Sequence, residues 1–454
     1  MKRILKVVLG MLCGLLAILL ALLIALWLYT NGANMRRPQI AEEECPQWVL
    51  QRSDTLRVMG PNWLKQAAWG LWLMHVEGAP YARGYAAGQM GGDLVHYQEE
   101  AFLQQIYRFI PSRWYRKLLF RLVVLFDYHL AEYVNLEYRK EIFGVAEVFG
   151  EEQNELGPPY ERQLNYHAAH DIGHAAQSYR LVGCTAFALR DSASRGMGLL
   201  VGRNFDMDLG DDFARHKMVM DCQPTQGYRF VSVAWPAMMG VVSGINEKGV
   251  TVTINALPQE LPKSAKTPIS LIAREIVQYA QNIEEAYTIA RRRPCFVSEC
   301  LLVVSASEQR AALIEKTPDT TLLFEPEGSE LLVTNQFTNP LLVGSVTERA
   351  SVAYDSQQRM ARLRELLDSL RSLDAAGAAR VLRDDKGAKG MPLPRGAAGA
   401  INQYQSHHSV IFAPQEGMMW VAVDRAKSTY FALRLPWADS LGLRRCPEFD
   451  ISLR

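Results

Sequence analysis

The spacing of hydrophobic positions changes along the chain, and the first segment is almost uniformly apolar. No charged residue interrupts the run from Val7 to Tyr29, whereas Lys2, Arg3 and Lys6 precede it. At about 1.5 Å rise per residue, a helix over residues 7–29 is long enough to cross a bilayer core of about 30 Å. We therefore expect residues 7–29 to be the part of the chain that meets a membrane.

This apolar run predicts an uncleaved signal anchor over residues 1–30. Cleavable signal peptides usually have a shorter apolar region of about 7–15 residues, followed by a small-residue cleavage site. Here the run ends in Trp27-Leu28-Tyr29, which is typical of a membrane interface. The positive-inside rule places the N-terminus in the cytoplasm and the rest of the chain in the periplasm, a lumen or the extracellular space. A cleaved signal peptide is the alternative.

The pattern after the anchor is helical. Apolar residues at three- and four-residue spacing predict helices over 84–110 and 114–150, with a further helix over 160–178. Residues 31–62 contain three prolines and a run of three glutamates, which favours an irregular tether. We therefore expect an α-rich segment over 63–183.

The pattern changes again at residue 184, where short runs rich in Val, Ile, Leu and aromatic residues begin. Strands are expected at 185–190, 198–205, 217–223, 228–235, 239–244, 250–255, 298–305, 310–316, 320–325, 330–335, 408–413, 417–424 and 428–434. Helices are expected at 268–292, 355–371 and 373–383. Long antiparallel sheets with a few inserted helices indicate a layered α+β body over residues 184–454.

Composition narrows the possible functions. The chain has 454 residues, a formal net charge of +1 and 49% hydrophobic residues, which is ample for a large core. The balanced charge gives no support for nucleic-acid binding. No Walker loop, dinucleotide fingerprint, His-Glu-x-x-His or Gly-x-Ser-x-Gly motif is present, so we expect no cofactor. The sequence does not indicate an oligomeric state.

Six cysteines lie outside the anchor, and some of them can pair in an oxidising compartment. A bridge between Cys45 and Cys446 would join the two ends of the body, and Cys295 and Cys300 could close a short loop. Both pairings stay open, as does that of Cys222.

Cys184 has the features of a self-activating nucleophile. It follows Gly183 and opens a predicted strand. Its thiol can attack the preceding carbonyl, and hydrolysis of the resulting thioester would leave Cys184 as a new N-terminus. The new α-amine, with an ordinary pKa of about 8, can serve as the base for its own thiol. The alternative is a buried strand cysteine that packs as a small hydrophobe.

Two charged residues end the next predicted strand. If that strand runs antiparallel to the one after Cys184, Arg203 and Asp206 lie beside the thiol. A guanidinium lowers the pKa of a thiol, and a carboxylate can hold the new α-ammonium. The alternative is a surface ion pair, which contributes little.

Two asparagines end apolar strands further along the chain. Asn255 ends the run Val252-Thr253-Ile254, and Asn335 follows Leu332-Val333-Thr334. An amide donor at the tip of a buried strand is well placed to bind a developing oxyanion. Asparagines also form turns after strands, which is the alternative for both positions.

A histidine-rich stretch offers metal-ligand spacing. His167, His170, Asp171 and His174 fall on one face of a predicted helix. Such a face can bind a metal ion, but we favour polar helix contacts and expect no metal site.

Four runs together resemble a known family: GCTAFAL…GRNFD, INEKGVTVTINAL, VTNQF and YDSQQRMARLRELL. They resemble the acyl-coenzyme A:6-aminopenicillanate acyltransferase family of self-processing N-terminal-nucleophile hydrolases, related more distantly to choloylglycine hydrolases and acid-ceramidase-like amidases. The resemblance covers roughly residues 84–435 and is strongest over 183–257. It implies a four-layer αββα sandwich, cleavage between Gly183 and Cys184, and hydrolysis or transfer of an acyl group from an amide.

The resemblance also implies roles for individual residues. Cys184 matches the nucleophile and Asp206 the residue that orients its amine, and Arg203 and Asn204 lie in the matching strand. Asn255 and Asn335 match positions near the oxyanion. The resemblance further assigns contacts with the substrate to Asn204, Ser356 and Arg359, the last two through a matching Ser-x-x-Arg segment.

The chain departs from the family at two of these positions. Arg203 stands where the penicillin enzyme has Gln and the choloylglycine group has Arg. Asn335 is followed by Gln-Phe where the acyltransferases have His, so the substrate preference does not carry over.

Together these features predict a membrane-anchored, self-processing cysteine amidohydrolase that cleaves small N-acyl compounds through a Cys184 thioester. Hydrolysis is favoured over transfer because acyl-coenzyme A is scarce outside the cytoplasm. A lipid esterase or phospholipase-like enzyme on the same scaffold is one alternative, and faster turnover of esters than of matched amides would identify it. A non-catalytic anchored interaction protein is the other, and it predicts an uncleaved chain with an unreactive Cys184.

Overall fold

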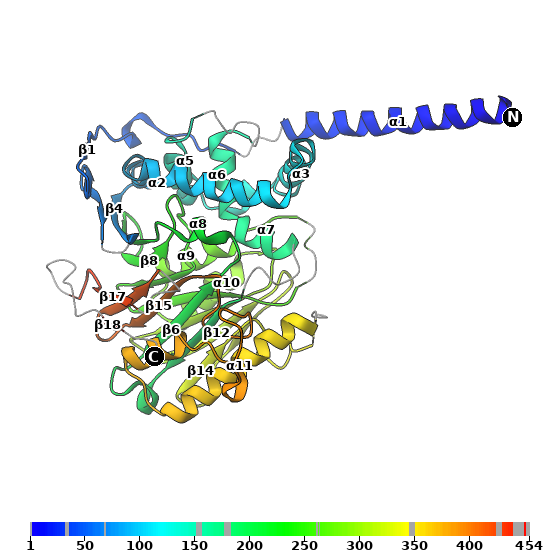
Figure 1. Cartoon of the computed structure of the whole chain (residues 1–454). Helices are drawn as coiled ribbons and strands as arrows, with labels where there is room; N and C mark the ends of the chain where they lie inside the picture. The colour runs from blue at the N-terminus through cyan, green and yellow to red at the C-terminus, as the bar shows by residue number, and fades with distance from the viewer. Residues whose placement is uncertain are drawn as a thin grey trace.

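Two β-sheets form the centre of the molecule in the computed structural model (Figure 1). The structure describes residues 2–31, 36–67, 70–150, 157–176, 183–259, 262, 264–344, 350–423, 429–438 and 449–450.

The larger sheet has eleven strands and combines both halves of the chain. Its order is β1 (Leu50–Arg52), β2 (Leu56–Met59), β3 (Asn62–Gln66), β4 (Trp72–Gly78), β7 (Met218–Pro224), β8 (Phe230–Ala234), β9 (Ser243–Asn246), β10 (Val250–Ala256), β11 (Glu299–Ser305), β12 (Arg310–Lys316) and β13 (Thr321–Phe324). Neighbouring strands are antiparallel except β4 and β7, which pair in parallel over seven residues. The strands before Cys184 thus join the strands after it through a single ladder.

The smaller sheet has seven strands, all from the chain after Cys184. Its order is β14 (Glu330–Val333), β5 (Thr185–Leu189), β6 (Leu200–Asp206), β15 (Ser406–Ala413), β16 (Met418–Ala422), β17 (Thr429–Arg434) and β18 (Phe449–Asp450). All pairs in this sheet are antiparallel.

The helices fall into a group before Cys184 and a group after it. The first is α1 (Lys2–Asn31), α2 (Pro80–Phe109), α3 (Arg113–Phe126), α4 (Leu130–Tyr133), α5 (Leu136–Ala146), α6 (Pro159–His167) and α7 (Ala169–Ala176). The second is α8 (Gly210–Ala214), α9 (Ile269–Tyr279), α10 (Ile283–Arg292), α11 (Ala350–Leu370) and α12 (Ala375–Leu382).

Successive side chains of a strand point to opposite faces of its sheet, so apolar side chains lie on both faces of each sheet. They form three buried clusters. In β5, Ala186 faces side chains of the larger sheet such as Val219. The next residue, Phe187, packs with Leu363 of α11 on the opposite face. A third cluster joins the larger sheet to helices before and after Cys184, including α2, α5 and α9. Apolar contacts therefore connect helices to the larger sheet, the two sheets to each other, and the smaller sheet to α11 and α12.

The first strands of the chain differ from the sequence-based expectation. Residues 31–62 were expected to form an irregular tether, but β1 and β2 lie within this range, and β3 and β4 follow. β1, β2 and β3 have only three, four and five residues, which is too short for the long apolar runs that predicted the other strands. β4 has seven residues, is mostly buried and begins with the apolar run Trp72-Leu73-Met74, yet it was not predicted.

Three expected helices are broken into shorter ones. The expected helix over 160–178 is divided at Ala168 into α6 and α7. The expected helix over 114–150 ends at Phe126 and resumes as α4 and α5. The expected helix over 268–292 ends at Tyr279, and Asn282 caps the new helix by accepting a hydrogen bond from the backbone N–H of Glu285. Capping side chains favour a new start over continuation of the helix. The strand expected at 239–244 is shifted to Ser243–Asn246.

Within the described residues, one helix segment, Arg3–Thr30, is long and apolar enough to cross a membrane. It extends away from the body (Figure 1). Cys295 and Cys300 are free cysteines in the described part of the chain, so they do not bridge to each other. Cys446 lies outside the described residues, so the bridge considered between Cys45 and Cys446 stays a prediction.

Candidate active site

Cys184 lies at the start of β5, between the two sheets. It is fully buried, and its Sγ atom is 3.5 Å from the Nη2 atom of Arg203 on β6. The antiparallel register, which pairs Ala186 with Arg203, brings the two side chains together. Burial raises the pKa of the Cys184 thiol to about 11, against the opposing effect of the Arg203 guanidinium. In the intact chain this thiol is therefore protonated at neutral pH.

The Arg203 guanidinium is held in place from several sides. Its Nη1 atom donates to the Ser243 hydroxyl at 2.8 Å, and its Nη2 atom donates to the carbonyl of Ile254. The guanidinium carbon lies 4.4 Å from the centre of the Phe205 ring. On the other side of Ser243, its Oγ lies 3.1 Å from the Nε2 atom of His408. Arg203 thus links Cys184 on the smaller sheet to Ser243 and Ile254 on the larger one.

Gly183 and Asp206 are tied together through Gln403. The amide nitrogen of Gln403 donates to the carbonyl oxygen of Gly183 at 2.6 Å and to Asp206 Oδ2 at 3.0 Å. The N–H of Gly183 donates to the backbone carbonyl of Asp206 at 3.1 Å. A Cβ atom at position 183 would lie 2.6 Å from Gln403 Oε1, so only glycine fits this contact without a shift.

Asp206 is a buried carboxyl with an altered acidity. Burial raises its pKa to about 7, while the hydrogen bond from the Ser406 hydroxyl and the charge of Arg359 act in the opposite direction. A positively charged partner at short range strongly stabilises the ionised form of such a carboxyl, because it offsets the free-energy cost of burying the charge.

Asn255 is buried at the end of β10, next to the Ile254 carbonyl that accepts from Arg203. Neither its amide nitrogen nor its amide oxygen has a hydrogen-bond partner in the described part of the chain. Buried amides are nearly always hydrogen-bonded, so an unpaired one at such a site requires an explanation.

The Asn335 amide, in contrast, is hydrogen-bonded at both its nitrogen and its oxygen. Its nitrogen donates to the carbonyl of Ala256 at 2.9 Å, and its oxygen accepts from Arg359 at 2.7 Å. The backbone N–H of Asn335 donates to the Ser356 hydroxyl at 3.1 Å. Ser356 and Arg359 therefore contact Asn335, and they join α11 to the strand ends around the site.

Asn204 faces away from the thiol. Because side chains alternate along β6, Arg203 points toward the larger sheet and Asn204 toward α12. Its amide nitrogen donates to the carbonyls of Leu382 and Ile401 at 2.8 and 2.9 Å. Its oxygen accepts from the Ser409 hydroxyl at 2.6 Å. The structure therefore does not bring Asn204 to the group around Cys184, and its hydrogen bonds are structural.

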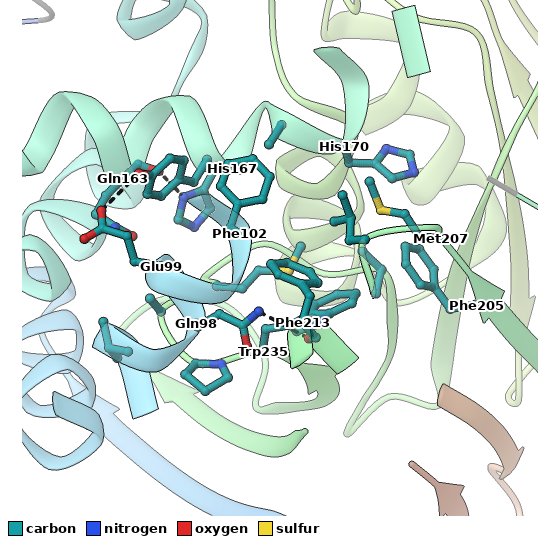
Figure 2. A pocket seen from close by; sticks show the side chains of 18 of the residues that line it. Gln98, Glu99, Phe102, Gln163, His167, His170, Phe205, Met207, Phe213 and Trp235 are labelled. Atoms are coloured by element: carbon teal, nitrogen blue, oxygen red, sulfur yellow. Dashed lines mark hydrogen bonds between the residues drawn. The ribbon is translucent and has the colours of Figure 1, made fainter. Parts of the chain in front are cut away.

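An apolar pocket opens near the end of β6 (Figure 2). Its empty volume is about 750 Å³, including the open mouth. Phe205, which contacts Arg203, lines it together with Phe102 of α2, Phe213 of α8 and Trp235. Apolar and aromatic walls of this kind are typical of small-molecule sites.

Two polar side chains in the pocket wall, Glu99 and His167, are held by protein partners. Glu99 accepts hydrogen bonds from Arg162 and Tyr166, both at 3.0 Å. The Nε2 atom of His167 accepts from the backbone N–H of Met239 at 2.9 Å, and its Nδ1 lies 2.7 Å from the Gln163 carbonyl. Burial lowers the pKa of His167 to about 4, so it is neutral.

The histidine-rich stretch contributes to one group of potential metal ligands in the part of the chain that the structure describes. His170, Asp171 and Glu299 place ligand atoms within 4.8 Å of one another, and all three are buried. Burial raises the pKa of Glu299 to about 8, so its carboxyl is protonated at neutral pH in the structure as it stands. His167 is not part of the group, and the side chain of His174 lies outside the described residues.

Residues 193–428, about half of the chain, match the family model described as acyl-coenzyme A:6-aminopenicillanic acid acyl-transferase. The chain belongs to this family. The matched residues include Arg203, Asp206, Asn255, Asn335 and Gln403, whereas Cys184 lies before the start of the match.

Two curated proteins are similar to this chain in sequence. An uncharacterized protein of Archaeoglobus fulgidus is 27% identical over 237 residues, covering 49% of this chain and 39% of the relative. Protein dcd1B of Dictyostelium discoideum is 22% identical over 274 residues, covering 56% of this chain and 52% of the relative. The chain thus spans about half or less of the length of the curated relatives that it matches.

Solved structures that are similar to this chain include the following three. An N-acylethanolamine-hydrolyzing acid amidase ortholog of Caenorhabditis elegans has 16% identity and a TM-score of 0.38, covering 51% of this chain and 93% of that one. A mutant conjugated bile acid hydrolase of Clostridium perfringens has 11% identity and a TM-score of 0.39, covering 58% and 96%. Penicillin V acylase of Agrobacterium tumefaciens has 13% identity and a TM-score of 0.37, covering 57% and 89%.

Sequence reasoning missed several polar residues in the group around Cys184. Ser243, Gln403, Ser406 and His408 all contact Arg203 or Asp206. The only available signal was the polar run from Gln403 to Ser406, directly before an apolar strand. Polar residues of this type are equally common in surface turns, so the run did not identify them.

Proposed function

We propose that this chain is a cysteine amidohydrolase that activates itself by cleavage between Gly183 and Cys184. The observation that carries the proposal is the arrangement at that bond. The Cys184 thiol lies beside Arg203, and the carbonyl oxygen of Gly183 accepts a hydrogen bond from Gln403. Family membership adds support, because the resemblance implies the same nucleophile.

In the proposed cleavage, the sulfur of Cys184 attacks the Gly183 carbonyl carbon and the thiol proton passes to the Cys184 nitrogen. Gln403 stabilises the negative charge that develops on the carbonyl oxygen, as an oxyanion-hole donor does. The C–N bond breaks and leaves a thioester with a free α-amine on Cys184. Water then hydrolyses the thioester, giving a Gly183 carboxylate and the Cys184 thiol.

In the mature enzyme, the Cys184 α-amine accepts the thiol proton. Asp206, held by Ser406 and Gln403, lies close enough to the chain at residue 183 to orient the resulting ammonium. Arg203 favours the thiolate. The thiolate attacks the substrate amide carbonyl, and the ammonium protonates the leaving amine. Water then releases the acyl group from the thioester.

We assign the oxyanion contact during turnover to Asn255, because its amide N–H groups have no partner in the described residues. Asn335 is assigned a supporting role, since its own amide is bonded to Ala256 and Arg359. Ser356 and Arg359 act on Asn335 as positioning residues.

The proposed substrate is a small N-acyl compound with an apolar acyl group. The aromatic pocket beside Phe205 supports this choice, because its polar wall residues Glu99 and His167 are engaged by protein partners. Hydrolysis is proposed over transfer, and no cofactor takes part in the proposed steps. An esterase acting on lipid esters remains the second candidate, since the same pocket would accept an apolar acyl ester.

The proposal places α1 across a membrane, with its N-terminus in the cytoplasm and the catalytic body outside it. The apolar segment Arg3–Thr30 and the basic residues before it support this topology. We also infer a four-layer αββα order for the body. It is supported by the three apolar clusters that connect helices, larger sheet, smaller sheet and helices in turn.

Denaturing electrophoresis with N-terminal sequencing tests the proposal. The 51.1-kDa chain should yield two pieces, residues 1–183 and 184–454, with Cys184 at the new N-terminus. Cys184→Ala should stay whole, and Gln403→Leu should be cleaved more slowly. An intact wild-type chain would refute self-activation, whereas cleavage without turnover of any N-acyl amide would refute only the amidohydrolase.

A further inference from the structure

Helix α3 carries an apolar stripe on the surface of the molecule. Trp114, Leu122 and Leu125 are 67%, 43% and 42% exposed. Together with Leu118 they follow a spacing of four, four and three residues, which places them on one helix face. Phe109, at the end of α2, is also exposed. Several large apolar side chains exposed side by side indicate a contact surface rather than ordinary solvent exposure.

This stripe is not the face that packs α3 on the body. Val124 is the buried residue of α3. At the end of the helix, the Phe126 ring packs edge-on against Phe296, with 5.7 Å between ring centres. The helix is therefore fixed by one face and by its end, and the stripe is left outside.

The charge on α3 is entirely of one sign. Its fourteen residues include four basic side chains and no acidic one. Arg116 lies over the Tyr107 ring at 4.3 Å and donates to the Ile110 carbonyl at 2.9 Å, which fixes the start of the helix. An apolar stripe on a helix whose charged side chains are all basic is the composition of a helix that lies in a membrane interface.

The position of α3 beside α1 identifies the partner. Tyr29, near the end of the apolar helix, stacks on Tyr128, with ring centres 4.5 Å apart and an interplanar angle of 16°. Arg121 of α3 donates to the Thr30 hydroxyl at 3.2 Å. Figure 1 shows α3 directly at the body end of α1. Trp27 and Tyr29 are aromatic residues of the type that marks the level of lipid headgroups.

We propose that α3 is an interfacial helix that lies in the headgroup region of a phospholipid bilayer, with its stripe among the acyl chains. Its basic side chains then lie at the level of the lipid phosphates. The helix would hold the body against the membrane at a second point besides α1. The inference rests on the proposed membrane span and is independent of the proposed chemistry.

Site-specific photo-crosslinking of the full chain in phosphatidylcholine–phosphatidylglycerol vesicles tests this proposal. Benzoylphenylalanine is placed at Trp114 or Leu122 on α3, at Leu16 inside α1, or at Tyr404, which is 60% exposed elsewhere on the body. After illumination, mass spectrometry detects lipid or protein adducts at each position. We expect lipid adducts at Leu16, Trp114 and Leu122, and none at Tyr404.

Each other result overturns the proposal in a distinguishable way. Lipid adducts at Leu16 without any at Trp114 and Leu122 would mean that α1 spans the bilayer while α3 stays in water. Crosslinked dimers from the α3 positions would mean that a second copy covers the stripe. Absence of lipid adducts at Leu16 would refute the membrane span, and the interfacial helix with it. None of these results depends on cleavage or catalysis at Cys184.

Discussion

At the scale of single residues, two buried asparagines, one in each sheet, have opposite hydrogen-bonding states. Asn255 has no partner for its amide in the described residues, whereas Asn204 donates twice and accepts once. An unpaired buried amide lowers the stability of the folded chain, and such groups are usually kept because they have a function.

We expect Asn255→Ala to reduce turnover by about 100- to 1,000-fold, as loss of one oxyanion donor does. Its melting temperature should be unchanged or higher, because no hydrogen bond is lost. The matched control is Asn204→Ala, which leaves the Leu382 and Ile401 carbonyls unpaired, at about 1–3 kcal/mol each. Steady-state kinetics and thermal unfolding measure both. Equal losses of stability in the two variants would contradict the distinction.

Glu299 should make stability depend on pH. Burial raises its folded pKa to about 8, above the ordinary value of 4.5, so the folded state keeps a proton that the unfolded state releases. This contribution is fully present below about pH 4.5 and is lost as pH rises through 8, at no more than about 1.4 kcal/mol per pH unit.

Glu299→Gln should therefore match the wild type near pH 5 and be more stable than it near pH 8, as measured by thermal unfolding at both values. Glu308→Gln is the control. Although burial raises the pKa of Glu308, hydrogen bonds from the Ile283 N–H and Arg310 outweigh it and the pKa is lowered. That variant should gain nothing at pH 8. A parallel gain in both variants would rule out Glu299 as the source.

At the scale of elements, helices α2, α6 and α7 build one wall of the pocket and the chain after Cys184 builds the other. Phe102 of α2 faces Phe213 of α8, with ring centres 5.9 Å apart. The shape of the pocket thus depends on how these elements pack against each other.

Ala169→Phe should fill part of this pocket at the start of α7. We expect kcat/KM to fall about tenfold or more for long-chain N-acyl amides, because each excluded methylene is worth about 1 kcal/mol or more. N-acetyl substrates should be turned over as before. Ala388→Phe, outside the pocket lining, is the control. A uniform loss across chain lengths would show that the pocket does not hold the acyl group.

Elements with long, regular patterns could be predicted from the sequence, and elements defined by tertiary contacts could not. The strands from β5 to β17 have apolar runs, so their existence was predicted, with β9 displaced. β1 and β2 lack such runs, because they have only three and four residues. At the site, Cys184, Arg203 and Asp206 lie in or beside recognisable strands, whereas Gln403 reaches Gly183 from 220 positions away along the chain. Contacts of that separation leave no local signal.

At the scale of the whole molecule, the segment before Cys184 is part of the core rather than an attachment to it. β4 pairs with β7 over seven residues, and Glu141 forms a buried ion pair with Arg274 at 3.1 Å. Glu137 also accepts a hydrogen bond from Tyr279 at 2.6 Å. These contacts join the two sides of the proposed cleavage site.

The two pieces formed by cleavage should therefore stay together in mild detergent and separate only in denaturant, as size-exclusion chromatography can measure. Arg274→Met should lower the denaturant concentration needed for separation. It leaves Arg83 as the ion-pair partner of Glu141 among the described residues, and breaking a buried pair costs about 3–5 kcal/mol. Pieces that elute apart without denaturant would contradict this prediction.

The shared β4–β7 ladder determines whether a molecule can refold after it has been unfolded. Before the cut, both strands belong to one chain, and folding is a unimolecular event that heat or denaturant can reverse. After the proposed cleavage, the same ladder would join two separate chains, so the unfolded enzyme could refold only by a bimolecular encounter between the two fragments. Its apparent stability would then depend on protein concentration, and its lifetime would be set by the rate of unfolding rather than by an equilibrium.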